Sequence, residues 1–225
     1  MTDKTIRYFD RKFKLPFAKS LDKAGDWQLP VIPPCHILPK GVVAYDQIKV
    51  STPRDLFVVF HCWDDRIENT WLDSESAIKK LSRFNGVFMP DFSMLTDMDF
   101  PLCVYNLWRC RVLARWFLEN EIEVLPSAKW WNEKSLEHCF DGLPKHSLIS
   151  VSNVATVRSR EGDRLFRIGY ERMLQVLDPA GVILYGSIPR IPYPGPKPYF
   201  FQNTHHSGEG LSYLGIEQQQ LKEEE

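Results

Sequence analysis

Asp91 is the residue whose type and place in the chain point most directly to chemistry. It follows the apolar run at residues 86–89, which is predicted to form a strand. A carboxylate at the end of a strand, here next to Ser93, can act as a general base or bind a hard cation. The structural alternative is an aspartate that caps the loop by accepting backbone N–H bonds. We take Asp91 and Ser93 as candidate catalytic residues.

His61 is the third candidate catalytic residue. It lies in the apolar run at residues 56–62, and Asp64 and Asp65 follow it closely. An imidazole beside a carboxylate is suited to proton transfer. A nucleophile–base pair between His61 and Cys62 is excluded, because adjacent residues on a strand point to opposite faces of the sheet.

Asn106, Arg109 and Trp130 are candidate ligand-binding residues. Asn106 and Arg109 are three residues apart in a predicted helix and share a face of it. Arg109 could bind a phosphate or a carboxylate with two parallel hydrogen bonds, or it could pair with an acidic residue of a neighbouring element. Trp130 follows a predicted strand, where its ring could stack on a base or a sugar, or pack in the core.

Ser150 and Tyr185 complete the candidate ligand-binding residues, because they lie at two further strand ends. In α/β folds, ligands bind where strands end and loops begin. No metal site is predicted, since the five cysteines show none of the close pairs typical of structural zinc or iron–sulfur sites. The sequence does not identify a cofactor, which stays unknown.

The elements that must position these residues alternate between strands and helices. The strands are expected at residues 42–45, 56–62, 86–89, 122–125, 147–151 and 182–185, and the helices at 74–84, 102–120, 133–140 and 162–177. Strands that alternate with helices indicate an α/β fold with a mainly parallel sheet. We expect an incomplete TIM-like barrel of repeated βα units, with an open doubly wound sheet as the alternative. No glycine-rich dinucleotide-binding motif follows any strand.

Three segments are expected along the chain. Residues 1–41 read as an irregular N-terminal arm, residues 42–187 as the α/β domain, and residues 188–225 as a proline- and aromatic-rich segment with a flexible acidic tail.

Charge and cysteine content limit the partners and the compartment. The 28 Lys and Arg residues nearly balance the 29 Asp and Glu residues, so no overall field attracts nucleic acid or an anionic membrane. The odd number of cysteines argues against a disulfide framework. No signal peptide and no apolar stretch of bilayer length is visible. We therefore expect a cytoplasmic protein with no membrane partner.

A series of short motifs resembles a known family. In chain order the motifs are Pro90-Asp91-Phe92-Ser93, Tyr105-Asn106 with Arg109 and Arg111, a strand ending near Trp130, Phe140-Asp141-Gly142-Leu143-Pro144, Ser150, and Tyr185-Gly186. Their order and spacing over residues 42–186 resemble the family catalogued as domain of unknown function 4417. The resemblance implies a bacterial, phage or plasmid-borne protein. It carries over no catalytic residue, and the segment after Gly186 departs from the family pattern.

Two functions remain open at this point. The first is a domain that binds or acts on a phosphorylated small molecule or a nucleotide-like ligand at the carboxyl ends of its strands, with Asp91 as base or cation ligand, Arg109 holding the anion and Trp130 stacking. The second is a non-catalytic protein that binds a host protein or nucleic acid through its aromatic and proline-rich arms. The first requires a parallel sheet that brings Asp91, Trp130, Ser150 and Tyr185 to one rim, with Arg109 turned toward it.

Overall fold

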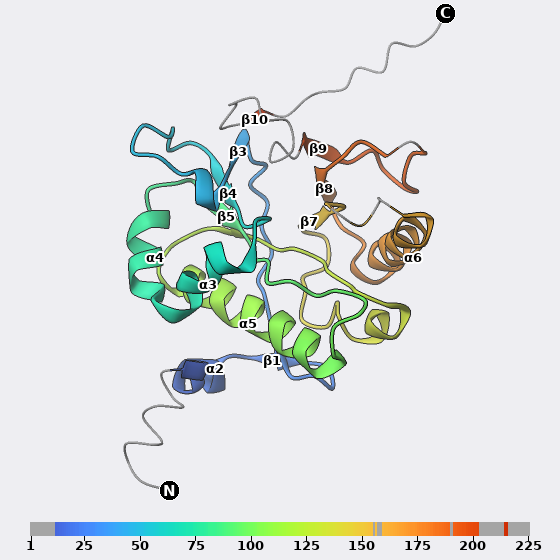
Figure 1. The fold of residues 1–225 in the computed structure, drawn as a ribbon, viewed down its shortest axis with the longest axis horizontal. Coiled ribbons are helices and arrows are strands. Elements are labelled where there is room, and N and C mark those ends of the chain that lie inside the picture. The colour runs from blue at the N-terminus through green and yellow to red at the C-terminus, as the bar shows by residue number, and fades with distance from the viewer. Residues whose placement is uncertain (1–11, 155, 157–158, 190, 203–213, 216–225) are drawn as a thin grey trace, which may run out of the picture.

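The architecture is seen in a computed structural model that describes residues 12–154, 156, 159–189, 191–202 and 214–215 (Figure 1). The strands are β1 (Lys23–Ala24), β2 (Leu29–Pro30), β3 (Gly41–Ala44), β4 (Phe57–Val59), β5 (Gly86–Phe88), β6 (Val124–Leu125), β7 (Leu148–Ser152), β8 (Gly181–Gly186), β9 (Tyr199–Gln202) and β10 (Leu214–Gly215). The helices are α2 (Leu15–Ser20), α3 (Asp64–Leu72), α4 (Ser74–Leu81), α5 (Phe100–Glu119) and α6 (Arg160–Leu177), with 3-10 turns η1 (Tyr45–Gln47) and η2 (Glu133–Glu137).

Two mainly parallel sheets carry the fold. The first has the order β10-β3-β4-β5-β6, in which β3 to β6 are parallel and β10 is antiparallel to β3. The second has the order β7-β8-β9, and its strands are all parallel. A parallel bridge between Ser127 and Ser150 connects the segment after β6 to β7. There the Ser150 N–H donates to Pro126 O at 2.8 Å, and the Ala128 N–H donates to Ser150 O at 2.9 Å.

Each parallel strand is buried on both faces, which explains why the strands read as continuous apolar runs. One face joins the helices in the larger core, through residues such as Val58, Val87 and Val182. The opposite faces of the strands form a second, smaller cluster, which we call the inner cluster. Its members are Cys35, Val42, Ala44, Phe57, Val59, Phe88, Leu125, Leu148, Ile183, Tyr185 and Phe201. Every strand from β3 to β9 therefore contributes to one shared interior.

Figure 1 shows how the helices surround the strands. Helices α3 and α4 lie on one side, α6 lies on the opposite side, and α5 runs below. Helices α3 and α4 connect β4 to β5, α5 connects β5 to β6, and α6 connects β7 to β8, as in repeated βα units. The expected α/β class with mainly parallel strands is confirmed. The incomplete TIM-like barrel is not confirmed, since the strands form two hydrogen-bonded sheets and no closed barrel is shown among the described residues. The sequential strand order also lacks the reversal of a doubly wound sheet.

Three differences from the expected elements concern α3, η2 and β9. Helix α3 was not expected, because Ile67 and Trp71 are the only large apolar residues that it buries and the surrounding sequence is polar. The helix expected at residues 133–140 is the short 3-10 turn η2. Strand β9 lies in the proline-rich segment beyond residue 187 and pairs with β8, so part of that segment completes the second sheet.

The N-terminal arm has more structure than expected. It contains α2 and the antiparallel pair β1–β2. Its later part is tied to the domain, where the Ile32 N–H donates to Gly142 O and the Cys35 N–H donates to Ser147 Oγ, each at 2.9 Å. Residues 1–11 and most of the acidic tail lie outside the described residues. In the described part of the chain, no helix combines the length and the apolar character needed to cross a membrane.

Candidate functional site

Asp91 lies at the centre of a group of three ionisable side chains. One carboxylate oxygen, Oδ2, contacts Nδ1 of His61, and the other, Oδ1, contacts Nζ of Lys129. The three residues, which we call the Asp91 cluster, follow the neighbouring parallel strands β4, β5 and β6. Carboxyl ends of parallel strands share one edge of a sheet, and this brings together residues that are 30 and 38 positions apart (91 − 61 and 129 − 91).

The Asp91 cluster is largely withdrawn from water. The side chains of His61, Lys129 and Asp91 are 5%, 11% and 23% exposed, respectively. Burial lowers the pKa of His61 to about 3, and the positive charge of Lys129 acts in the same direction. The contact with the Asp91 carboxylate acts in the opposite direction. Burial is the larger effect on the pKa, so His61 is neutral at neutral pH.

Two opposing effects act on Lys129. Burial lowers its pKa to about 7, while the negative charge of Asp64 favours the ammonium form. The direct contact with the Asp91 carboxylate also favours the ammonium form, because each charge stabilises the other. We therefore treat Lys129 and Asp91 as a charged pair.

Tyr185 reaches the Asp91 cluster from the second sheet. Its ring stacks on the imidazole of His61, with the centroids 4.8 Å apart and the planes inclined by 23°. Tyr185 belongs to the inner cluster and is almost fully buried, and burial raises the pKa of its phenol. The stacking fixes the plane of the imidazole and links the ends of β4 and β8.

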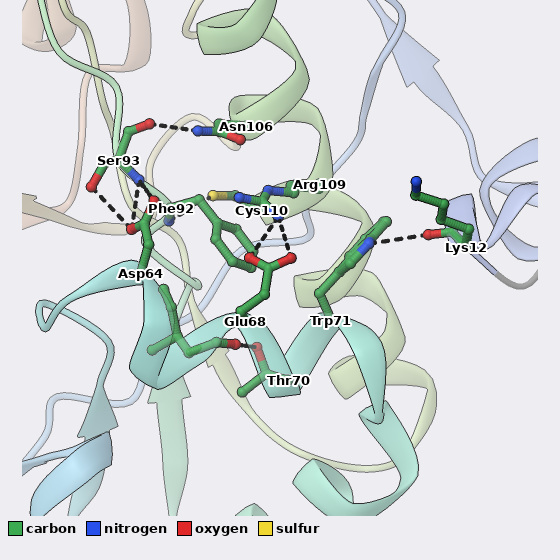
Figure 2. Close-up of polar contacts among 11 residues, drawn as sticks. Lys12, Asp64, Glu68, Thr70, Trp71, Phe92, Ser93, Asn106, Arg109 and Cys110 are labelled. Atoms are coloured by element: carbon green, nitrogen blue, oxygen red, sulfur yellow. Dashed lines mark hydrogen bonds and ion pairs between the residues drawn. The ribbon is translucent and has the colours of Figure 1, made fainter.

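The loop after β5 is held by two helices, as Figure 2 shows. Ser93 donates from its backbone N–H and from its hydroxyl to the carboxylate of Asp64, at 3.0–3.2 Å. On the other side, Asn106 Nδ2 of α5 donates to Ser93 O at 2.6 Å. The Phe92 N–H donates to Cys110 Sγ at 3.4 Å. These bonds position the loop that carries Asp91.

Arg109 contacts α3 and the same loop, and its guanidinium forms an ion pair with Glu68 of α3. Its Nη1 lies 2.9 Å from both carboxylate oxygens of Glu68, and its guanidinium lies 3.5 Å from the centroid of the Phe92 ring (Figure 2). This is the salt bridge to a neighbouring element that the sequence left open as the alternative. Arg109 and Asn106 therefore support the loop, while their expected ligand-binding roles stay predictions.

Trp130 packs away from the Asp91 cluster. Its ring lies against Phe140, Phe166 and Gly169, and its Nε1–H donates to Leu165 O at 3.2 Å. Gly169 provides the space, because an added Cβ would lie 2.1 Å from the indole. Trp130 and its neighbour Lys129 thus point in different directions, as successive residues of an extended segment do.

Ser150 is buried at the junction of the two sheets. Its hydroxyl contacts the hydroxyl of Ser127 and donates to Pro126 O at 3.2 Å. Of the residues expected at one rim, Asp91 and Tyr185 each contact His61. Ser150 helps join the two sheets, and Trp130 and Arg109 point to the helices.

Sequence reasoning did not select Lys129 or assign Asp64 its role on the loop. One sequence feature could have indicated Lys129: it follows the third of three consecutive predicted strands, just as His61 and Asp91 follow the first two. Within the described ranges, His, Cys, Asp and Glu side chains do not gather in any group of three or more that could hold a metal ion. The five cysteines, which all lie in those ranges, are free thiols.

Comparisons with known proteins give a family and two relatives. The model of the family described as "Domain of unknown function (DUF4417)" matches residues 21–193. Gene 1 protein of Mycobacterium phage D29 is 26% identical over 168 residues, which cover 72% of this chain and 61% of the relative. Gene 1 protein of Mycobacterium phage L5 is 23% identical over 172 residues, which cover 75% of each chain. This chain thus spans less than two thirds of the first relative's length. No solved structure matches.

Proposed function

This chain belongs to the family of domain of unknown function 4417, and we propose that it binds a phosphorylated or nucleotide-like ligand at the carboxyl ends of β4, β5 and β6. The observation that carries the proposal is the Asp91 cluster, in which three ionisable groups that are largely withdrawn from water meet at the ends of three adjacent parallel strands. In α/β folds this edge is where ligands bind, and ionisable groups are buried there for function more often than elsewhere.

Lys129 is the group that would hold the anion. Its ammonium carries three donors, and Asp91 is its ion-pair partner. Within the described residues, Nζ has no further hydrogen-bond acceptor. A phosphate oxygen would supply one. Lys129 thereby takes the role that the sequence suggested for Arg109, whose charge is held by Glu68. Asp91 keeps its proposed role as a base.

The setting of this function is also part of the proposal. The two relatives are phage proteins, and we infer a phage or plasmid origin for this chain as well. The five free cysteines support a reducing, cytoplasmic site of action.

Replacement of Lys129 tests the proposal. We expect the wild-type protein to bind AMP or ribose 5-phosphate in isothermal titration calorimetry, and Lys129→Met to weaken this binding at least about tenfold, because a charge-assisted hydrogen bond is lost. The control is Lys145→Met, which removes an exposed lysine before β7. Equal affinities of the two variants, or no binding of either probe by the wild type, would contradict the proposal. Melting temperatures verify that both variants fold.

The alternative, a surface that holds a host protein or nucleic acid, is favoured by one observation. Ile188 and Ile191 in the proline-rich segment are 51% and 66% exposed. This segment is fixed to α6, since Arg167 donates to Ile191 O at 2.7 Å and to Pro192 O at 3.1 Å. On this alternative, binding is insensitive to Lys129→Met and is reduced by Ile188→Ser with Ile191→Ser.

A further inference from the structure

His61 has one ring nitrogen with a partner and one without. Nδ1 contacts Asp91 Oδ2. Nε2 is buried and has no hydrogen-bond partner among the described residues. A buried polar atom without a partner costs stability, so such atoms are uncommon in native proteins unless a ligand or water meets them. The imidazole plane is held by stacking on Tyr185, so Nε2 points in a fixed direction.

The contact with Asp91 decides which nitrogen carries the hydrogen. An ionised carboxylate only accepts hydrogen bonds, so Nδ1 must be the N–H donor. A neutral imidazole has one N–H, and Nε2 is consequently the bare acceptor nitrogen. A second proton on His61 would place an imidazolium beside the Lys129 ammonium in a buried site, and both burial and like charge oppose this.

We propose that Asp91 holds His61 in the Nδ1–H tautomer and that the bare Nε2 accepts a hydrogen bond from an O–H or N–H group of the bound ligand. This inference rests on the proposed function, and it narrows the ligand. Nε2 is an acceptor and does not bind a phosphate oxygen. The phosphate belongs at Lys129, and a neutral donor group of the same molecule belongs at His61. Sugar phosphates and nucleotides with free hydroxyls combine these two features, whereas sulfate, which carries no O–H at neutral pH, lacks the second.

Asp91→Asn provides a sharp test, because it inverts the tautomer while keeping the ring. In this variant the buried Lys129 amino group still carries N–H donors that need an acceptor, and the oxygen of the introduced amide is the group that can supply it. The amide NH₂ then faces Nδ1, which must become the acceptor, and the hydrogen moves to Nε2. The same logic explains why an amide in place of the triad aspartate gives a serine protease histidine the wrong tautomer.

The measurement is ¹⁵N NMR of the histidine ring nitrogens at neutral pH, with His61 assigned by its loss in His61→Gln. We expect a protonated Nδ1 and a bare Nε2 in the wild type, and the reverse in Asp91→Asn. Asp141→Asn is the matched control, because Asp141 lies 3.2 Å from Nδ1 of the more exposed His138 in the same type of contact. It should leave the His61 signals unchanged.

The outcomes separate this inference from the proposed function. A protonated Nε2 in the wild type, or an unchanged tautomer in folded Asp91→Asn, overturns the inference. The wild-type spectrum decides the tautomer even where the variant does not fold. Ribose 5-phosphate should shift the bare Nε2 signal, and sulfate, which has no O–H to donate at neutral pH, should not. Binding of ribose 5-phosphate that depends on Lys129 but leaves Nε2 unshifted overturns the inference and retains the function. The expected tautomers without any binding contradict the proposed function and the ligand contact at Nε2, and they support the tautomer assignment.

Discussion

At the scale of the residue, His61 links the candidate site to the stability of the protein. Its pKa is about 3 in the folded chain and 6.5 in an unfolded one. Between these values the unfolded chain binds a proton that the folded chain does not, so acid favours unfolding. The contribution of His61 is fully present above pH 6.5 and is lost as the pH falls toward 3.

We therefore predict that the free energy of unfolding decreases as the pH falls below 6.5, with His61 contributing at most about 1 kcal/mol for each pH unit. Urea unfolding between about pH 7 and pH 5, where few carboxylates titrate, measures this slope. The slope should be smaller in His61→Gln. It should be unchanged in His146→Gln, which removes an exposed histidine. A slope that survives in His61→Gln would show that another group is responsible.

At the scale of the element, the loop after β5 depends on α3 and α5. Asn106 contributes from α5 through its 2.6 Å hydrogen bond to Ser93 O. We predict that Asn106→Ala destabilises the protein by about 1–2 kcal/mol, because a partly buried carbonyl loses its partner, and weakens ligand binding, because Asp91 loses its position. Urea unfolding and calorimetric titration measure the two effects.

Asn120→Ala is the matched control. Asn120 lies at the end of the same helix, and its Nδ2 donates to Trp116 O at 2.8 Å, away from the loop. This variant should lose some stability and bind the ligand as the wild type does. Equal losses of binding in both variants would mean that binding follows the overall stability of α5 and not the position of Asp91.

Sequence patterns predicted the elements wherever apolar periodicity was strong. Helix α4 buries Ala77 and Leu81 at helical spacing, and α6 has a similar stripe from Phe166 to Leu177, so both were expected. Helix α3 was missed because most of its residues are polar and it has too few apolar residues to show a helical period. Strand β9 was missed because Tyr199–Gln202 follows a proline-rich stretch that argues against a strand.

The candidate site could be predicted only in part. Asp91 and His61 were each found from their places at strand ends, and their catalytic roles stay predictions. Their contact depends on β4 and β5 being neighbours in a parallel register, and the contact with Lys129 adds β6 to this requirement. The apolar pattern of a single segment does not show which strands are neighbours in the sheet. The partner of Arg109 could not be predicted either, because Glu68 lies on α3, a helix that was not expected.

At the scale of the whole molecule, the inner cluster couples the two sheets. It draws side chains from every strand between β3 and β9, including Leu125 of the first sheet and Ile183 of the second. We predict that the sheets unfold together, with tryptophan fluorescence and far-UV circular dichroism giving one urea midpoint. Ile183→Ala should shift both signals equally, with a loss of about 2–5 kcal/mol. Val50→Ala, at an exposed position, should shift neither. Two separate midpoints would show that the sheets are independent.

The position of Phe201 in the inner cluster has a consequence for the order of events during synthesis. Val42 leaves the ribosome early, whereas β9, which carries Phe201, emerges after all the other parallel strands. Until then, β8 of the nascent chain lacks its neighbour β9, and the apolar side chains around Ile183 remain exposed to water. The last folding step of this domain is therefore delayed until translation has passed the proline-rich segment, and the chain is most open to proteases and to self-association in that interval.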